Sequence, residues 1–125
     1  MLAGKEAIAT VAVKDISRAK RFYEETLGLR LTQDQESEAL TYESGGSKLL
    51  VYRSQYAGSN QATAATWTIG KDMEKVVQSL KGKGVKFEHY DMPGMTLKGD
   101  IHVADGFKVA WFKDPDGNIH ALVSG

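Results

Sequence analysis

The chain repeats one structural pattern twice, and this repetition constrains its fold more than any other feature. Thr10–Ile16 and Trp67–Met73 both run from a short apolar stretch through a Lys-Asp pair into an amphipathic helix. The apolar side chains of the two helices recur at helical spacing: Ala19, Phe22, Tyr23 and Leu27, then Met73, Val76, Val77 and Leu80. Gly28 ends the first helix and Gly84 follows the second. The recurrence indicates an internal duplication.

Short apolar or alternating segments surround each helix and predict its strands. They are residues 7–13, 29–32, 40–43 and 48–53 in the first half, and 64–69, 85–90, 101–104, 107–113 and 119–123 in the second. We expect a single α+β domain of paired βαβββ modules, module one at about 7–54 and module two at about 64–124, connected by residues 55–63. One helix cannot cover both faces of a four-stranded sheet, so a cleft is expected on the face opposite the helices.

Composition excludes several classes of function. The 16 Lys and Arg residues balance 16 Asp and Glu residues, so the basic excess of proteins that bind nucleic acid or anionic membranes is absent. The sequence has no cysteine, which excludes a disulfide framework, a thiolate zinc site and a cysteine nucleophile. The first residues lack the pattern of an export signal, and no apolar run reaches the ~18 residues of a membrane span. We therefore expect a cytoplasmic protein.

Several segments resemble the vicinal oxygen chelate superfamily, which contains glyoxalase I, bleomycin-resistance proteins and extradiol dioxygenases. They are Val13–Ile16, Phe22-Tyr23 with Leu27-Gly28, Gly84-Val85 and Phe112–Asn118. In this order on a duplicated frame they cover nearly the whole chain and are specific for the fold. The resemblance implies a U-shaped mixed sheet around a cleft. It does not specify the chemistry, because the superfamily contains isomerases, dioxygenases, transferases and drug-binding proteins.

The resemblance also implies four metal-ligand positions, two in each module. One of each pair lies seven residues before a helix-capping aspartate, Asp15 or Asp72, and the other lies near the end of the last strand. These positions hold Ile8, Leu50, Ala65 and Ala121. None of these side chains has a lone pair for a metal ion. We therefore expect neither a metal nor another cofactor at the usual site.

An apolar cleft remains, as in the bleomycin-resistance type, which binds its ligand without metal and usually as a homodimer. We predict a homodimeric small-molecule-binding protein, of a sequestering or resistance type, for an apolar or planar ligand. Strand alternation groups Trp67 with Ala65 and Tyr52 with Leu50, and we expect these pairs to face the cleft. The predicted ligand-binding residues are Ile8, Thr10, Leu50, Tyr52, Ala65, Trp67, Trp111, Ala121, Met92 and Met95.

Two other interpretations stay open. One is a glyoxalase-like lyase or dioxygenase with displaced ligands such as His102, whose neighbour Asp100 on the same strand face can tune a general base. The other is a partner-binding module whose aromatic side chains fill the cleft. Pro93-Gly94 indicates a loop at residues 91–99, and its methionines make this loop a candidate lid.

Overall fold

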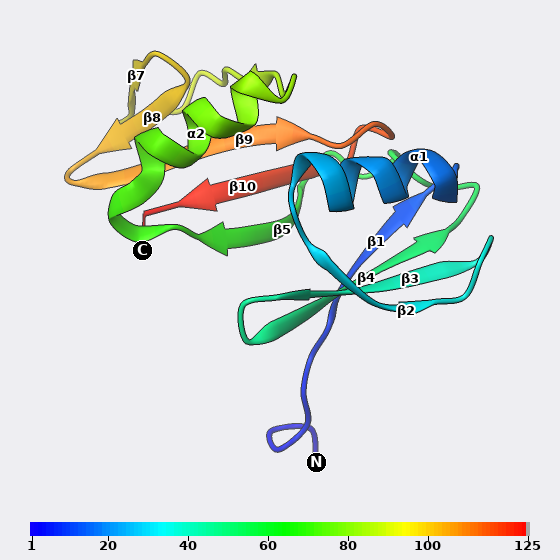
Figure 1. Cartoon of the computed structure of the whole chain (residues 1–125). Coiled ribbons are helices and arrows are strands. Elements are labelled where there is room, and N and C mark those ends of the chain that lie inside the picture. The colour runs from blue at the N-terminus through cyan, green and yellow to red at the C-terminus, as the bar shows by residue number, and fades with distance from the viewer. Residues whose placement is uncertain (125) are drawn as a thin grey trace.

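The chain folds into two modules that each combine one helical segment with one sheet (Figure 1). A computed structural model describes residues 1–124. The first module contains β1 (Ala9–Val13), α1 (Ile16–Lys20), η1 (Arg21–Thr26), β2 (Arg30–Asp34), β3 (Ala39–Ser44) and β4 (Ser47–Arg53). The second contains β5 (Thr63–Thr68), η2 (Gly70–Asp72), α2 (Met73–Gly82), β6 (Phe87–Glu88), β7 (Thr96–Lys98), β8 (Ile101–Ala104), β9 (Phe107–Lys113) and β10 (Ile119–Val123). This order confirms the predicted α+β class.

The first sheet is buried on the side that packs against α1. Its strand order is β1-β4-β3-β2, with β1 parallel to β4 and the other pairs antiparallel. Val11 of β1 and Val51 of β4 belong to the buried cluster under the helix. Asp15 caps α1 as predicted, because its carboxylate accepts a hydrogen bond from the Arg18 backbone N–H at 3.2 Å. We call the side of each sheet that packs against the helices the helix side, and the opposite side the outer face.

The second sheet repeats this arrangement with more strands. Its order is β5-β10-β9-β8-β7, β6 pairs with β9, and β5 is parallel to β10. Phe112 of β9 and Leu122 of β10 pack with Met73 and Val77 of α2 in a buried cluster. Alternate side chains of the same strands therefore point to the outer face.

The two modules share one continuous core on the helix side. Helix α1 widens into the π-helical turn η1, where the Leu27 N–H donates to the Phe22 carbonyl at 2.9 Å. Phe22 and Leu27 pack against the buried clusters of both modules, and so does Trp67 of β5. The uncovered outer faces consequently lie on the outside of the chain.

A buried polar network joins the modules across this core. The Tyr23 hydroxyl of η1 donates to Oδ2 of Asp114 at 2.7 Å and lies 2.8 Å from Nε2 of His120. Because the hydroxyl has one hydrogen and gives it to Asp114, His120 donates from Nε2–H. The Asn118 side chain donates to the Ala12 carbonyl of β1 at 2.7 Å and to Oδ2 of Asp114 at 2.8 Å. The turn that joins β9 and β10 thus holds the first module in place.

Burial sets the protonation of this network. Desolvation raises the pKa of the Tyr23 hydroxyl far above its usual range, and the charge of Asp114 adds to the effect. Desolvation lowers the pKa of His120 to about 4, against the opposing attraction of Asp114. The tyrosine and the histidine of the network are therefore both uncharged at neutral pH.

The second module differs from the sequence prediction in three local features. The strand expected at residues 85–90 is limited to Phe87–Glu88. The predicted loop at residues 91–99 contains β7, whose backbone pairs with β8, a long-range contact that local periodicity does not report. Asp72 forms no side-chain cap on α2, because it closes the separate turn η2. No helix within residues 1–124 is long and apolar enough to cross a membrane.

Candidate ligand-binding site

The outer face of the first sheet carries a groove of about 400 Å³. It is lined by Ile8, Thr32, Gln33, Gln35, Ala39, Thr41, Lys48 and Leu50. The parallel register of β1 and β4 sets Thr10 beside Leu50 and Ala12 beside Tyr52, so these side chains share the outer face. Ile8 is 43% exposed and Tyr52 40%, although burial is normal for large apolar side chains. The structure thus places Thr10, Leu50 and Tyr52 on one face of the sheet, and Ile8 lines the groove together with Leu50.

The outer face of the second sheet presents Trp111 beside Ala121. Ala121 of β10 lies opposite Trp111 of β9 and opposite Thr66 of β5. His120, its neighbour along β10, points to the helix side and is fully buried. This register decides the orientation of Trp111, which the sequence left open between two adjacent aromatic residues.

An aromatic cluster of Tyr90, His102 and Trp111 covers part of this outer face. The ring centroid of Trp111 lies 4.9 Å from that of His102 and 5.3 Å from that of Tyr90, both in edge-to-face contacts. Burial, with the charge of Glu88 as a smaller cause, raises the pKa of the Tyr90 hydroxyl. The sequence reasoning missed Tyr90. Its place beside Trp111 depends on the pairing of β6 with β9, in which Glu88, two residues before Tyr90, lies opposite Trp111.

The predicted pairing of His102 with Asp100 is wrong. Nε2 of His102 lies 3.0 Å from the Tyr90 backbone nitrogen and 3.1 Å from its carbonyl oxygen. Asp100 precedes the first residue of β8, so strand alternation does not extend to it. Its carboxylate instead accepts from Lys81 at 2.7 Å and lies 2.8 Å from His89, and these contacts lower the pKa of Asp100. His102 therefore lacks the carboxylate partner that the hypothesis of a tuned general base required.

Trp67 and Ala65 face the helix side, contrary to prediction. The Trp67 ring packs edge-on against His120 with a centroid distance of 5.4 Å, and Ala65 pairs with His120 across β5 and β10. The count of seven residues back from Asp72 failed because η2 inserts an extra turn between β5 and α2. No such turn separates β1 from α1. Ala65 and Trp67 do share one face, but it is the face that the helices cover.

The two methionines of the predicted lid lie in the segment that leads into β7, the edge strand of the second sheet. Met92 is 38% exposed, and Met95 is half-buried in the turn that precedes β7. Leu97 of β7 lies opposite His102 of β8. The segment therefore ends beside the aromatic cluster of Tyr90, His102 and Trp111.

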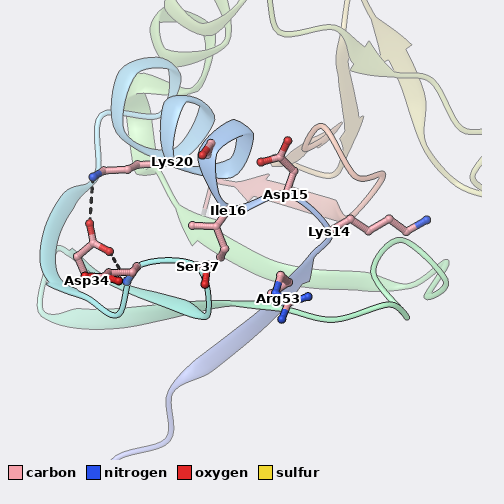
Figure 2. Close-up of a pocket in the computed structure, with 9 residues that line it drawn as sticks. Lys14, Asp15, Ile16, Lys20, Asp34, Ser37 and Arg53 are labelled. Carbon is pink, nitrogen blue, oxygen red and sulfur yellow. Dashed lines mark hydrogen bonds and ion pairs between the residues drawn. The ribbon is translucent and has the colours of Figure 1, made fainter.

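A larger hollow of about 580 Å³ lies between the start of α1 and the β2–β3 connection, and charged side chains line it (Figure 2). Lys20 donates to Asp34 at 3.0 Å, which raises the pKa of the Lys20 amine and lowers the pKa of the Asp34 carboxyl. None of the predicted ligand-binding residues lines this hollow. Exposed ion pairs of this kind contribute little binding energy, so we do not take it as the site.

Comparison with known families identifies the superfamily of the chain. Residues 7–122 match the model of the Glyoxalase/Bleomycin resistance protein/Dioxygenase superfamily. The chain belongs to this superfamily. The family assignment agrees with the resemblance stated above. No curated protein sequence matches the chain.

Solved structures share the superfamily fold at low sequence identity. A glyoxalase family protein from Enterococcus faecalis has a TM-score of 0.73 at 18% identity, and covers 98% of this chain and 99% of its own. The fosfomycin resistance protein FosX from Mesorhizobium loti has a TM-score of 0.69 at 14% identity, with 100% and 94% covered. The antibiotic-binding protein TnmS3 from Streptomyces has a TM-score of 0.63 at 23% identity, with 98% and 96% covered.

The metal of catalytic superfamily members does not fit the side chains at the corresponding positions. On the outer faces, Ile8, Leu50 and Ala121 offer only hydrocarbon, and Thr66, opposite Ala121, offers a single hydroxyl, whereas Ala65 faces the helix side. A metal of this class needs several oxygen or nitrogen donors. Within residues 1–124, no three His, Cys, Asp or Glu side chains are grouped as a metal centre requires. We therefore derive no chemistry through a metal at this site.

Proposed function

We propose that this protein binds an apolar, planar small molecule at the outer faces of its sheets, without a metal. The observation that carries the proposal is that apolar side chains occupy these faces: Ile8 and Leu50 line the groove on the first sheet, and Trp111 lies beside Ala121 on the second. The same faces expose a groove beside Ile8 and Leu50 and an aromatic surface at Trp111. Apolar walls with a few polar groups are typical of small-molecule sites.

Two of the solved relatives carry names that agree with a sequestering or resistance role. One is an antibiotic-binding protein and another is a fosfomycin resistance protein. Sequestration requires only a complementary pocket and no reacting group. The groove on the first outer face agrees with this requirement, since aliphatic, hydroxyl and amide side chains and one lysine line it. Met92 and Met95 lie in the segment that leads into β7, and flexible thioether side chains adapt to ligands of different shape.

We further propose that a second copy of the chain completes the site. Each outer face alone is open, and Ile8 projects from the segment that precedes β1, with 43% of its surface exposed. Placing the first outer face of one copy against the second outer face of another would enclose a ligand between Leu50 and Trp111. Burial of these exposed apolar side chains would stabilise such a homodimer.

Binding of anilinonaphthalene sulfonate, a planar fluorescent probe, tests the proposed site. We expect saturable binding that is unchanged by a metal chelator, and Trp111→Ala should weaken it about tenfold because stacking and burial are lost. Tyr56→Ala is the matched control, since it truncates an exposed aromatic side chain of the connecting segment, and it should leave probe affinity unchanged. Probe affinity that is unaffected by Trp111→Ala would contradict the proposal. Sedimentation equilibrium of the unmodified chain tests the homodimer separately.

A further inference from the structure

A second, smaller hollow opens on the helix side, away from the outer faces. Its volume is about 200 Å³, and it lies between the end of η1, the end of β3 and helix α2. It is lined by the buried side chains of Phe112 and Leu122, by Leu27 of the first module and by Val76 of α2. Both modules therefore contribute to it. We call this hollow the helix-side slot.

The slot is apolar and stays open instead of collapsing. Leu27, Ile69 and Val76 line it and remain half-buried, although they pack against the second core cluster. A filled core would bury such side chains completely, since protein interiors are close-packed. Apolar surface left in contact with water costs roughly 25 cal/mol per Å², so an apolar ligand in the slot recovers this free energy.

One polar group lies at the rim of the slot. The Trp67 indole Nε1–H donates to Oγ of Ser44 at 2.9 Å, which fixes the position of the hydroxyl. Ser44 gives its own hydroxyl hydrogen to no acceptor among residues 1–124, so this hydrogen is available to a ligand. The rim thus offers a single hydrogen-bond donor beside an apolar space.

We propose that the helix-side slot binds a small, flat, apolar molecule that carries one hydrogen-bond acceptor, such as an aromatic ketone. An apolar cavity of about 150 Å³ holds benzene, so a slot of about 200 Å³ suits one substituted ring. This site is separate from the proposed outer-face site, because it lies on the other side of the second sheet. A ligand here contacts both modules and stabilises their packing.

Acetophenone is a suitable probe, and the two tryptophans of the chain distinguish the two sites. Trp67 lines the slot and Trp111 lies on the outer face. In a titration followed by NMR, we expect the Trp67 indole N–H signal to shift saturably and the Trp111 signal to stay in place. Trp111→Phe assigns the two signals without altering the slot.

Two comparisons show whether acetophenone binds in the slot: one between two phenylalanine variants, and one between acetophenone and a ligand without an acceptor. Val76→Phe fills the slot and should weaken acetophenone binding by about tenfold or more, since overpacked sites exclude added groups. Gln78→Phe adds the same side chain at an exposed position of α2 and should leave the affinity unchanged. Ser44→Ala should weaken acetophenone about fivefold and leave ethylbenzene, which has no acceptor, unaffected. If Val76→Phe does not fold, Leu29→Phe fills the slot from the first module.

Three results would overturn the proposal. The first is a shift of the Trp111 signal without one of Trp67, which assigns the probe to the outer face. The second is the absence of a saturable shift with both acetophenone and ethylbenzene. The third is a change of oligomeric state on Val76→Phe but not on Gln78→Phe, because the slot would then be an interface between copies of the chain.

Discussion

His120 and His102 are both buried on the second sheet, and their surroundings differ on the two sides of that sheet. His120, on the helix side, contacts a tyrosine hydroxyl from the other module and is linked through it to Asp114. His102, on the outer face, contacts the backbone of nearby Tyr90 and the ring of Trp111. Polar groups on the helix side therefore join the two modules, whereas those on the outer face serve only the local structure of the second module.

The difference indicates that the helix side stabilises the fold and that the outer face is available for ligand binding. Side chains on the helix side are bonded across the module boundary, so their loss should unfold the whole chain. Side chains on the outer face contact few elements beyond their own sheet, so they can change with the ligand. Three predictions test this contrast.

Removal of the network carboxylate should have the largest effect. Asp114→Ala leaves the Tyr23 hydroxyl and the Asn118 amide without their buried acceptor, and it should lower the free energy of unfolding by about 3–5 kcal/mol. Urea denaturation followed by circular dichroism measures this change. Asp91→Ala, at an exposed position, should alter stability by less than about 0.5 kcal/mol. A loss at Asp114 no larger than the loss at Asp91 would refute the linking role of the network.

Acid should weaken the helix side through His120. The pKa of His120 is about 4 in the folded chain and about 6.5 when exposed, so between these values the unfolded chain binds the proton and the folded chain does not. Stability should therefore be complete above about pH 6.5 and fall by about 3 kcal/mol as the pH decreases to about 4. The pH dependence of the urea midpoint measures the loss. His120→Gln removes the titrating group and should flatten the curve in this window; an unchanged curve would assign the acid sensitivity elsewhere.

Truncation on the outer face should have the smallest effect on stability. Ile8→Ala removes a side chain that is 43% exposed, so the free energy of unfolding should fall by about 0.5 kcal/mol or less. Val11→Ala, three residues further along the chain, removes methyl groups from a side chain that is 1% exposed and should cost about 2 kcal/mol. Thermal unfolding of the two variants gives the comparison. Equal losses would show that the outer face contributes to the core.

The sequence predicted the helices and strands more accurately than the residues of the candidate ligand-binding site. The duplicated pattern predicted both helices and most strands, because burial of one helix stripe and one strand face imposes a local periodicity. Thr10, Leu50 and Tyr52 reach a common face because alternation along β1 and β4 continues without interruption. The predicted orientation of Trp67 was wrong, because the extra turn η2 precedes α2 and has no counterpart before α1.

The residues that the prediction missed depend on contacts between distant segments. Tyr90 joins Trp111 only because β6 pairs with β9, and the His102 side chain binds the Tyr90 backbone 12 residues away. The Asp100 carboxylate pairs with Lys81 of α2, which no spacing rule along β8 predicts. These contacts are set by sheet order and helix docking, which local periodicity does not encode.

The sequence by itself determined the α+β class and the recurrence of strands and helix in two modules, since both follow from side-chain chemistry and period along the chain. Only the tertiary structure decided that the helix sides of both sheets meet in one core, that the turn at Asp114 joins the modules, and which face each tryptophan occupies. The physical reason is that the face of the sheet to which a side chain points depends on strand register and on the turns between elements. A single extra turn moves a side chain from the outer face to the core without changing the pattern that precedes it.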